Sequence, residues 1–409
     1  MTRRPLLWLL ALAAVLYGSP TPARAGAVLT IGEDTKVNLG FRLQTQFNST
    51  EKNIDSDASD FERSDDFVVR RGRIRLGADV TRWVSMFLQT EVSDASAHAV
   101  GINMTMIDAF LKLKLHKLAH IIVGENMAPS TRQTVTSSGG LMAIDRVGIV
   151  YKSLTWGTRA KYNFTNTTFS DSDAGLRGAT DVRDLGATLF GSTSVTDTVH
   201  FKYYLGLYDG VQEAQEDNFR YAGRVQLNFF DPEPGYYNLT TYLGKKKTIG
   251  FGASYDAQQA VAKDLSDGSD VDYTFFSFDA FADYPIGPGY VTFEAGYEDL
   301  DLDGATQLDA KGDGSKVTNA RQAQGNGFYA EAGYFVRNWQ PWIEYEQWNS
   351  DGTNDKGSYD AWRFGLNYYI KGHNANVKAA YEIVNTDADI GSSSEDSVGS
   401  FLVGIYVTY

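Results

Sequence analysis

Apolar and polar residues alternate with a period of two along most of the chain. In KVNLGFRLQTQF, residues 36–47, the apolar Val37, Leu39, Phe41 and Leu43 are separated by polar or small residues. The same alternation recurs in 83–92, 107–116, 224–229, 291–298 and 400–409. A period of two is the pattern of a β-strand with one apolar and one polar face. The pattern predicts an all-β protein, either a soluble sandwich or a barrel.

Segment length and spacing favour a transmembrane antiparallel β-barrel over a sandwich. The segments run to about 10–12 residues, longer than an ordinary sandwich strand and long enough to cross a bilayer at a tilt. Short and long connections also alternate, as they do in outer-membrane barrels. The short ones lie near Thr81-Arg82, His116-Lys117, Ser153-Leu154, Val195-Thr196, 285–288, Asn338-Trp339 and Gly372-His373. The long polar ones are 48–66, 94–103, 166–181, 209–218, 258–271, 301–325, 350–358 and 386–397.

Counting segments in this way gives about 18 strands, within a predicted range of 16–18. One connection on the side of the short turns, 231–247, is longer than the others. Aromatic residues cluster near the predicted strand ends, which favours interfacial girdles over ordinary core packing. They are Trp83, Trp156, Tyr284, Tyr290, Trp339, Trp342, Trp348 and Trp362.

The first 25 residues have the pattern of an export signal. Arg3 and Arg4 precede an apolar run of 12 residues, Leu6 to Tyr17, and Ala23-Arg24-Ala25 has the form of a cleavage site. The run is too short for a membrane-spanning helix, which needs about 20 residues. We therefore expect a signal peptide at 1–25, and a barrel at 26–409 in the outer membrane of a Gram-negative bacterium.

Composition excludes several classes of function. The net charge of −14 argues against nucleic acid as a partner. The chain has no cysteine, and its five histidines form neither HxxxH nor HExxH, so we expect no cofactor and no metal site. His200 alternates with Phe201 and Tyr203, so it faces inward, and no serine partner is evident in the sequence. We therefore expect no enzymatic activity.

The stretch 67–80, FVVRRGRIRLGADV, places Arg71, Arg73 and Arg75 at every second position. Charge on the lipid face of a barrel costs about 2–4 kcal/mol at the midplane, so these side chains are expected to face the lumen and keep their hydration. The predicted pore-lining cations are Arg42, Arg71, Arg73, Arg75, Lys112, Lys114, Arg159, Lys161 and Arg224.

Two roles are open for these cations. Rings of Arg and Lys favour anions in a pore, but the same side chains could brace the wall by pairing with Asp79, Glu91, Asp108 and Asp279. Inward-facing acids are also predicted, at Glu294, Glu298, Glu331, Glu344 and Glu346. A wall divided into basic and acidic halves would produce a transverse field across the pore.

The connection at 125–146 differs from the acidic loops. It is not acidic and contains the apolar run Leu141-Met142-Ala143-Ile144. We expect it to fold into the lumen as a constriction loop carrying Arg132, Asp145 and Arg146; a surface loop or a subunit contact is the alternative. The acidic loops at 51–66 and 299–315 are expected to be solvated, with divalent-ion bridging to lipopolysaccharide as the alternative.

Several motifs in 67–150 resemble those of the phosphate-selective porin O/P family. They are Arg70-Arg71-Gly72-Arg73, Asp108-Ala109-Phe110, Pro129-Ser130, Thr136-Ser137-Ser138 and Asp145-Arg146. The resemblance implies a homotrimeric outer-membrane porin, usually of 16 strands. The family's lysine before the proline is replaced here, where the chain reads Glu125-Asn126-Met127-Ala128-Pro129, and the loops are acidic. These departures weigh against phosphate as the preferred solute.

The function expected from the sequence is passive diffusion of small hydrophilic solutes or ions, with a mild anion preference. The expected partners are outer-membrane lipid, lipopolysaccharide and two further copies of the chain. The alternative is a structural barrel that houses a partner, for example of an electron-transfer or surface complex.

Overall fold

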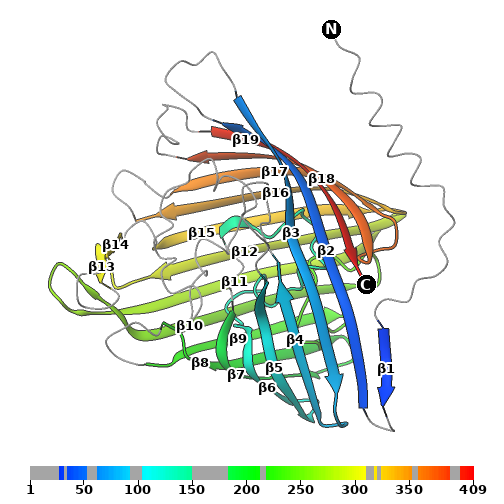
Figure 1. Ribbon diagram of the computed structural model, residues 1–409, viewed down its shortest axis with the longest axis horizontal. Helices are drawn as coiled ribbons and strands as arrows, with labels where there is room; N and C mark the ends of the chain where they lie inside the picture. Colours follow the sequence, from blue (N-terminus) through cyan, green and yellow to red (C-terminus); the bar gives the residue numbers. More distant parts are fainter. Residues whose placement is uncertain are drawn as a thin grey trace.

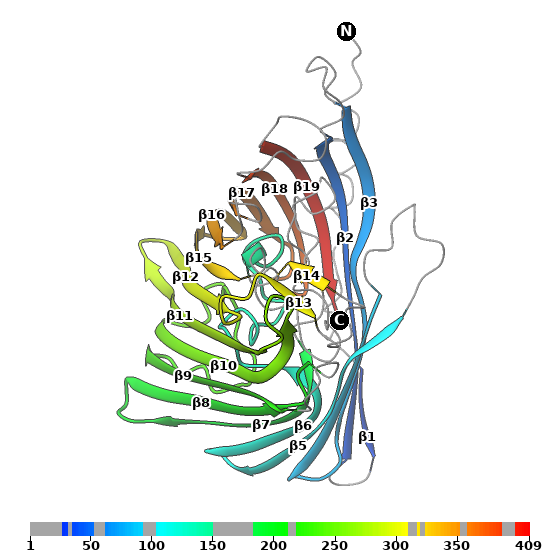
Figure 2. The same ribbon diagram turned by 90° about the vertical axis from the view of Figure 1, so that its left-hand side faces the viewer.

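The computed structural model describes ten stretches of the chain. They are residues 27–31, 35–52, 62–92, 104–149, 183–211, 218–309, 317–319, 324–351, 358–386 and 397–409. Within them the dominant feature is one antiparallel sheet that closes on itself (Figures 1 and 2). No helix among these residues is long and apolar enough to cross a membrane.

Sixteen of the described strands form a closed barrel. They are β2 (Thr35–Lys52), β3 (Glu62–Asp79), β4 (Val84–Glu91), β5 (Thr105–His116), β6 (Ala119–Met127), β7 (Arg183–Ser194), β8 (Val199–Tyr208), β9 (Arg220–Phe230), β10 (Thr248–Asp264), β11 (Asp270–Ile286), β12 (Gly289–Asp301), β15 (Gly325–Phe335), β16 (Trp339–Ser350), β17 (Tyr359–Tyr369), β18 (Ala375–Thr386) and β19 (Ser397–Thr408). The last strand closes onto the first, with Val407 opposite Leu43. Closure removes the unpaired edges of the sheet, so backbone groups of the strands bond to neighbouring strands.

Three short strands extend this barrel. β1 (Ala27–Ile31) pairs with residues 35–39 of β2, beyond the point where the Phe41 amide donates to the carbonyl of Tyr409. β13 (Gln307–Asp309) and β14 (Val317–Asn319) form a hairpin in the connection from β12 to β15. β13 also pairs with the end of β10.

The predicted alternation becomes an apolar outer face and a polar inner face. On β2, Phe41 and Leu43 are exposed while Arg42 and Gln44 are buried. The exposed apolar side chains of the outer face include Ile74, Leu111, Val123, Leu205, Val225, Leu227, Phe251, Phe278, Phe293, Phe328, Ile343, Phe364, Phe401 and Ile405. An exterior of this kind is stable against lipid and costly in water, so the barrel is built to cross a bilayer.

The barrel has 16 strands where the segment count gave 18. The additional hairpin was expected around the turn at Ser153-Leu154, which lies outside the described residues. β6 instead pairs directly with β7, from His120 opposite Phe190 to Met127 opposite Arg183, and leaves no place in the wall for two further strands. The wall formed by the described strands therefore has 16 members.

Short connections gather at one end of the barrel, which we call the turn end; the opposite end is the loop end. The C-terminus lies at the turn end, beside β1 (Figure 1). Trp83 and Trp339 are exposed near the turn end, as an interfacial girdle requires. Trp342 and Trp348 were assigned to the girdle wrongly: their side chains point inward and are 5% and 0% exposed. Trp156 lies outside the described residues.

Candidate functional site

The connection after β6 folds into the barrel, as the sequence predicted. We call residues 128–149 the inward loop. It begins three residues later than expected, because β6 continues to Met127. All its residues are buried except Ser137, Gly139 and Gly148. Figure 2 shows this teal stretch inside the ring of strands.

Apolar packing and a buried lysine hold the inward loop against one side of the wall. Met142, Ala143 and Ile144 form a cluster with Trp342, Ala380, Leu402 and Tyr406. The Nζ of Lys378 donates to the carbonyl oxygens of Leu141, Met142 and Ala143, at 2.6, 3.3 and 2.8 Å. The apolar run that set this segment apart in the sequence therefore packs on β16, β18 and β19.

Three charged side chains of the inward loop were predicted to lie at a constriction, and all three are buried inside the barrel. Asp145 accepts from Arg70 at 2.5 Å and from Arg71 at 2.6 Å. Burial alone would raise the pKa of the Asp145 carboxyl, but these two guanidinium groups hold it well below its ordinary value. Arg146 donates to the carbonyl oxygens of Gln133 and Thr136, so it braces the fold of the loop itself.

A second segment enters the barrel from the turn end, and the sequence did not predict it. Residues 231–247, which we call the plug, connect β9 to β10. The plug meets the inward loop through backbone hydrogen bonds. The Ser137 amide donates to Asn238, the Asn238 amide to Val135, and the Thr240 amide to Gly140, at 3.0, 2.8 and 3.1 Å. The length of this connection was its one visible signal.

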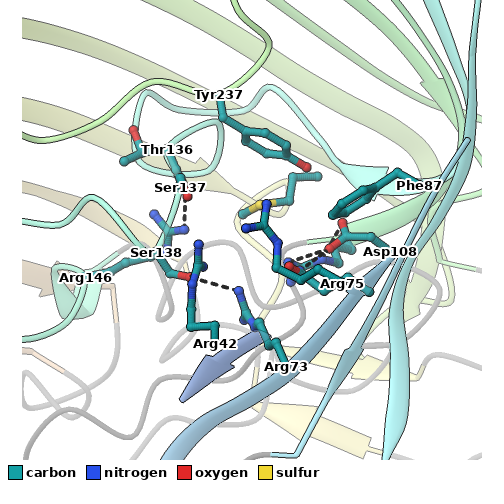
Figure 3. A pocket seen from close by; sticks show the side chains of 13 residues that line it. Arg42, Arg73, Arg75, Phe87, Asp108, Thr136, Ser137, Ser138, Arg146 and Tyr237 are labelled. Carbon is teal, nitrogen blue, oxygen red and sulfur yellow. Dashed lines mark hydrogen bonds and ion pairs between the residues drawn. The ribbon is translucent and has the colours of Figure 1, made fainter. Parts of the chain in front are cut away.

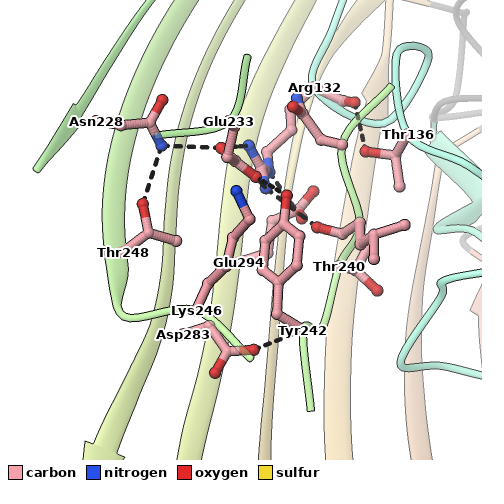
Figure 4. Close-up of polar contacts among 12 residues, drawn as sticks. Arg132, Thr136, Asn228, Glu233, Thr240, Tyr242, Lys246, Thr248, Asp283 and Glu294 are labelled. Carbon is pink, nitrogen blue, oxygen red and sulfur yellow. Dashed lines mark hydrogen bonds and ion pairs between the residues drawn. The ribbon is translucent and has the colours of Figure 1, made fainter. Parts of the chain in front are cut away.

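Glu233 of the plug is the centre of a buried polar network (Figure 4). Its carboxylate accepts from Arg132 of the inward loop at 2.9 and 2.8 Å, and also from the Tyr242 hydroxyl. Gln226 and Asn228 on β9 donate to it at 2.6 and 2.9 Å. Burial alone would raise the pKa of Glu233, but Arg132 more than offsets this and the pKa lies well below its ordinary value. The pair is therefore charged at neutral pH.

A small arginine pocket lies beside these two segments (Figure 3). Its volume is about 40 Å³, which is room for about three water molecules. Arg42 and Arg73 both donate to the Ser138 hydroxyl, at 2.8 and 2.9 Å. The lining is Arg42, Arg73, Arg75, Phe87, Gln89, Asp108, Met127, Thr136, Ser137, Ser138, Arg146, Arg183 and Tyr237.

Positive charge exceeds negative charge in this pocket. Five of the lining residues are arginines and one, Asp108, is an acid, paired with Arg183 at 2.9 Å. Arg73 pairs with Glu91, which lies next to the pocket. Arg75 has no ion pair within the described part of the chain, and its guanidinium lies 5.6 Å from the ring of Phe87. The arrangement suits a small anion.

Acidic residues occupy the opposite side of the interior. Glu294, Glu331 and Glu344 stand opposite one another on the neighbouring strands β12, β15 and β16. The row continues through Arg363 on β17, which pairs with Glu344, to Glu382 on β18. The interior is thus divided into a basic side and an acidic side.

The predicted pore-lining cations fall into two groups. Arg71, Arg73, Arg224 and Lys114 pair with Asp145, Glu91, Asp279 and Asp79, which is the bracing arrangement. Arg42, Arg75 and Lys112 make no ion pair with any described residue. Arg159 and Lys161 lie outside the described residues. Conduction past these side chains stays a prediction.

Hydration of the inward arginines was predicted wrongly. Arg42, Arg71 and Arg73 are 6%, 2% and 7% exposed. The reason is that the inward loop and the plug fill the space that the sequence left to water. Sequence reasoning also missed Arg183, Arg220 and Arg363. Arg220 and Arg363 stand between apolar neighbours as the others do, whereas Arg183 is followed by Asp184.

His200 has a serine partner after all. The Ser194 hydroxyl lies 2.9 Å from Nδ1, and Nε2 lies 2.6 Å from the carbonyl oxygen of Phe230. Because a carbonyl only accepts, Nε2 carries the proton and Ser194 donates to Nδ1. The imidazole is thus held by a backbone carbonyl, not by the carboxylate of a catalytic triad.

Comparison with known proteins identifies the architecture. No family model and no curated protein matches this sequence. Among solved structures, the anion-selective porin from Comamonas acidovorans is similar with a TM-score of 0.57 and 12% identity, over 92% of this chain and 100% of that one. The fold is that of outer-membrane porins.

Two further structures support this assignment of the fold. OmpF of Salmonella typhi, in complex with daunomycin, has a TM-score of 0.54 and 15% identity, over 94% of this chain and 100% of that one. OmpT of Vibrio cholerae, expressed in the outer membrane, has a TM-score of 0.52 and 12% identity, over 94% and 100%. At this level of identity the likeness concerns the porin fold alone.

Proposed function

We propose that this protein is an outer-membrane porin, a passive channel for small hydrophilic solutes or ions with a mild preference for anions. Residues 1–25 serve as its export signal, and it has no enzymatic activity. The resemblance of 67–150 to the phosphate-selective porin O/P family supports the porin assignment. Phosphate selectivity is not part of the proposal, because Glu125 to Ala128 contain no lysine.

The arginine pocket is the observation that carries the anion preference. It lies between the wall and the inward loop, where a porin narrows its pore, and it holds more positive charge than its acids neutralise. Pre-positioned guanidinium groups compensate an anion for the water it loses on entering a narrow site. An anion-selective porin is also among the proteins that share this fold.

The two internal segments set how far the pore is open. The arginine pocket, of about 40 Å³, admits water molecules, so a solute that passes at this point displaces the plug or the inward loop. Their contact includes backbone hydrogen bonds, a hydrogen bond from the Met142 amide to the Thr240 hydroxyl, and the pair of Arg132 with Glu233. We therefore propose a low-conductance channel whose open state depends on this contact.

Homotrimerisation and contact with lipopolysaccharide complete the proposal. OmpT of Vibrio cholerae, which shares the fold with a TM-score of 0.50, has been solved in a trimer form. The acidic loops 51–66 and 299–315 would face the cell exterior, where divalent ions would bridge them to lipopolysaccharide.

A partner-housing barrel is the second reading, and the filled interior weighs against it. The inward loop and the plug already occupy the space that a housed partner would need. Planar-bilayer recording of the purified chain separates the two readings. Discrete conductance steps, with a reversal potential in a KCl gradient that favours chloride, would support the porin. Absence of steps at any voltage would contradict it.

A further inference from the structure

Both ends of the barrel carry ion pairs, but the turn end also carries a run of lysines that has none. At the loop end, Arg63 pairs with Glu51 and Lys263 pairs with Asp270. At the turn end, the last three residues of the plug are Lys245-Lys246-Lys247. None of them makes an ion pair with any described residue. Lys246 is directed at the plug, where its Nζ donates to the Pro232 carbonyl. Lys247 is available for another partner.

Lys247 lies on the outer face of the barrel, over two aromatic rings. It immediately precedes β10, whose first residue, Thr248, faces inward and is fully buried, so Lys247 faces outward. Its Nζ lies 4.3 Å from the ring centre of Phe230 and 4.9 Å from that of Tyr284. An ammonium group held in this way at a membrane surface remains available on its outer side.

The backbone supports this position of the Phe230 ring. In register, Phe230 stands opposite the inward-facing Thr248, yet its ring packs on that of Tyr284 with centroids 5.7 Å apart. Its φ is +71°, a left-handed conformation that is strained for a bulky residue. This departure from alternation places the ring under Lys247.

An apolar surface adjoins the cation towards the middle of the membrane. Phe229 and Phe251 are 37% and 53% exposed on the outer face, with ring centroids 6.3 Å apart. A phosphodiester at Lys247 would therefore have its acyl chains against these rings. Free phosphate has no apolar part that could pack on this surface, whereas a lipid has acyl chains. The surface therefore favours a lipid as the ligand.

We propose that Lys247, with Phe230 and Tyr284, binds the phosphate headgroup of an anionic phospholipid in the leaflet at the turn end. This inference rests on the membrane location given by the proposed function. The headgroup accepts from the ammonium group, while the acyl chains lie along Phe229 and Phe251. Lys245, which is exposed next to the site, adds to its positive potential.

The test is native mass spectrometry of the full chain released from nanodiscs that contain phosphatidylglycerol and phosphatidylcholine. The wild type should retain phosphatidylglycerol preferentially, and Lys247→Gln should weaken that retention about fivefold. Lys247→Arg should keep it. Lys263→Gln, which removes the same charge at the loop end, is the matched control and should behave as the wild type.

Equal retention by Lys247→Gln and the wild type would overturn the lipid site. Complete displacement of the bound lipid by excess inorganic phosphate would also overturn it, since a ligand held by its acyl chains resists this competitor. Conductance of the same preparations separates this inference from the porin proposal. A chain that retains lipid through Lys247 but never conducts would contradict only the channel function.

Discussion

Arg132 of the inward loop holds Glu233 of the plug through two parallel hydrogen bonds, of 2.9 Å from Nη1 and 2.8 Å from Nη2. Both side chains are almost completely buried. The pair joins a segment that enters from the loop end to one that enters from the turn end. It is a charge-assisted, bidentate contact between the two segments, and Arg132 also pairs with Glu294 on β12 at 3.2 Å.

Replacing Arg132 by Gln should release the plug and lower stability. Glu233 would keep its buried charge without the guanidinium, and breaking a buried pair in this way costs about 3–5 kcal/mol. The free energy of unfolding in detergent should fall by an amount of this order. Single-channel records should also show larger or noisier openings, because the two segments separate more readily.

Arg63→Gln is the matched control for this prediction. It breaks the pair of Arg63 with Glu51, whose side chains are 36% and 32% exposed, and pairs of this kind contribute at most about 1 kcal/mol. Equal effects of the two substitutions on stability and conductance would show that the Arg132–Glu233 pair does not hold the plug.

A methyl group at Gly140 should loosen the contact between the inward loop and the plug without changing any charge. An alanine Cβ there would lie 2.3 Å from Cδ2 of Leu239 on the plug, so the side chain or the segment must move. Overpacking of this kind costs about 1–3 kcal/mol. We expect Gly140→Ala to raise the mean single-channel conductance. Gly235→Ala, where the Cβ would meet only a carbonyl oxygen at 3.5 Å, should leave it unchanged.

The arginine pocket predicts a change in selectivity. Arg42 and Arg75 have no acid partner among the described residues, so replacing both by Gln removes charge without stranding a carboxylate. A unit charge about 8 Å from a passing ion contributes about 2 kcal/mol at an effective dielectric constant of 20. The anion-to-cation permeability ratio, from reversal potentials in a KCl gradient, should therefore fall severalfold.

Two comparisons bear on this selectivity prediction. Arg63→Gln removes a charge at the loop end and should change the ratio much less. An unchanged reversal potential in the double variant would mean that the pocket arginines only brace the wall, as Arg73 does with Glu91.

The sequence predicted the wall of this protein much better than its interior. Alternation assigns a face to each strand residue, because lipid and the interior demand opposite polarity, so Arg42, Arg73 and Glu294 were placed correctly. The hydration of an inward-facing charged side chain depends on which other segments fill the interior of the barrel. Period-two alternation carries no information about those segments. The inward loop had an apolar run as its signal, whereas the plug differed from other turns only in length.

Strand count shows the same limit. Residues after 127 continue to mix polar and apolar side chains, so they were assigned in part to the wall. The pairing of Met127 with Arg183 leaves no room in the wall for two further strands. These two residues are far apart in the sequence, so a local pattern of apolar and polar residues cannot predict that they pair.

The last prediction concerns pH and His373, in the turn between β17 and β18. Its Nε2 lies 2.9 Å from the carbonyl oxygen of Thr241 on the plug, to which it donates. Burial, with Lys378, Lys245 and Arg42 nearby, lowers the pKa of His373 from 6.5 to about 4, against the opposing effect of the Thr241 hydrogen bond. A lowered folded-state pKa means that stability is complete above about pH 6.5 and is lost as pH falls towards 4. The loss is at most about 3 kcal/mol, since the ring is partly exposed.

The free energy of unfolding should therefore change more between pH 7 and pH 4.5 for the wild type than for His373→Gln. Asp145 and Glu233, whose pKa values are lowered, lose their contribution only at lower pH. An identical pH dependence in the two proteins would show that His373 does not couple protonation to the plug.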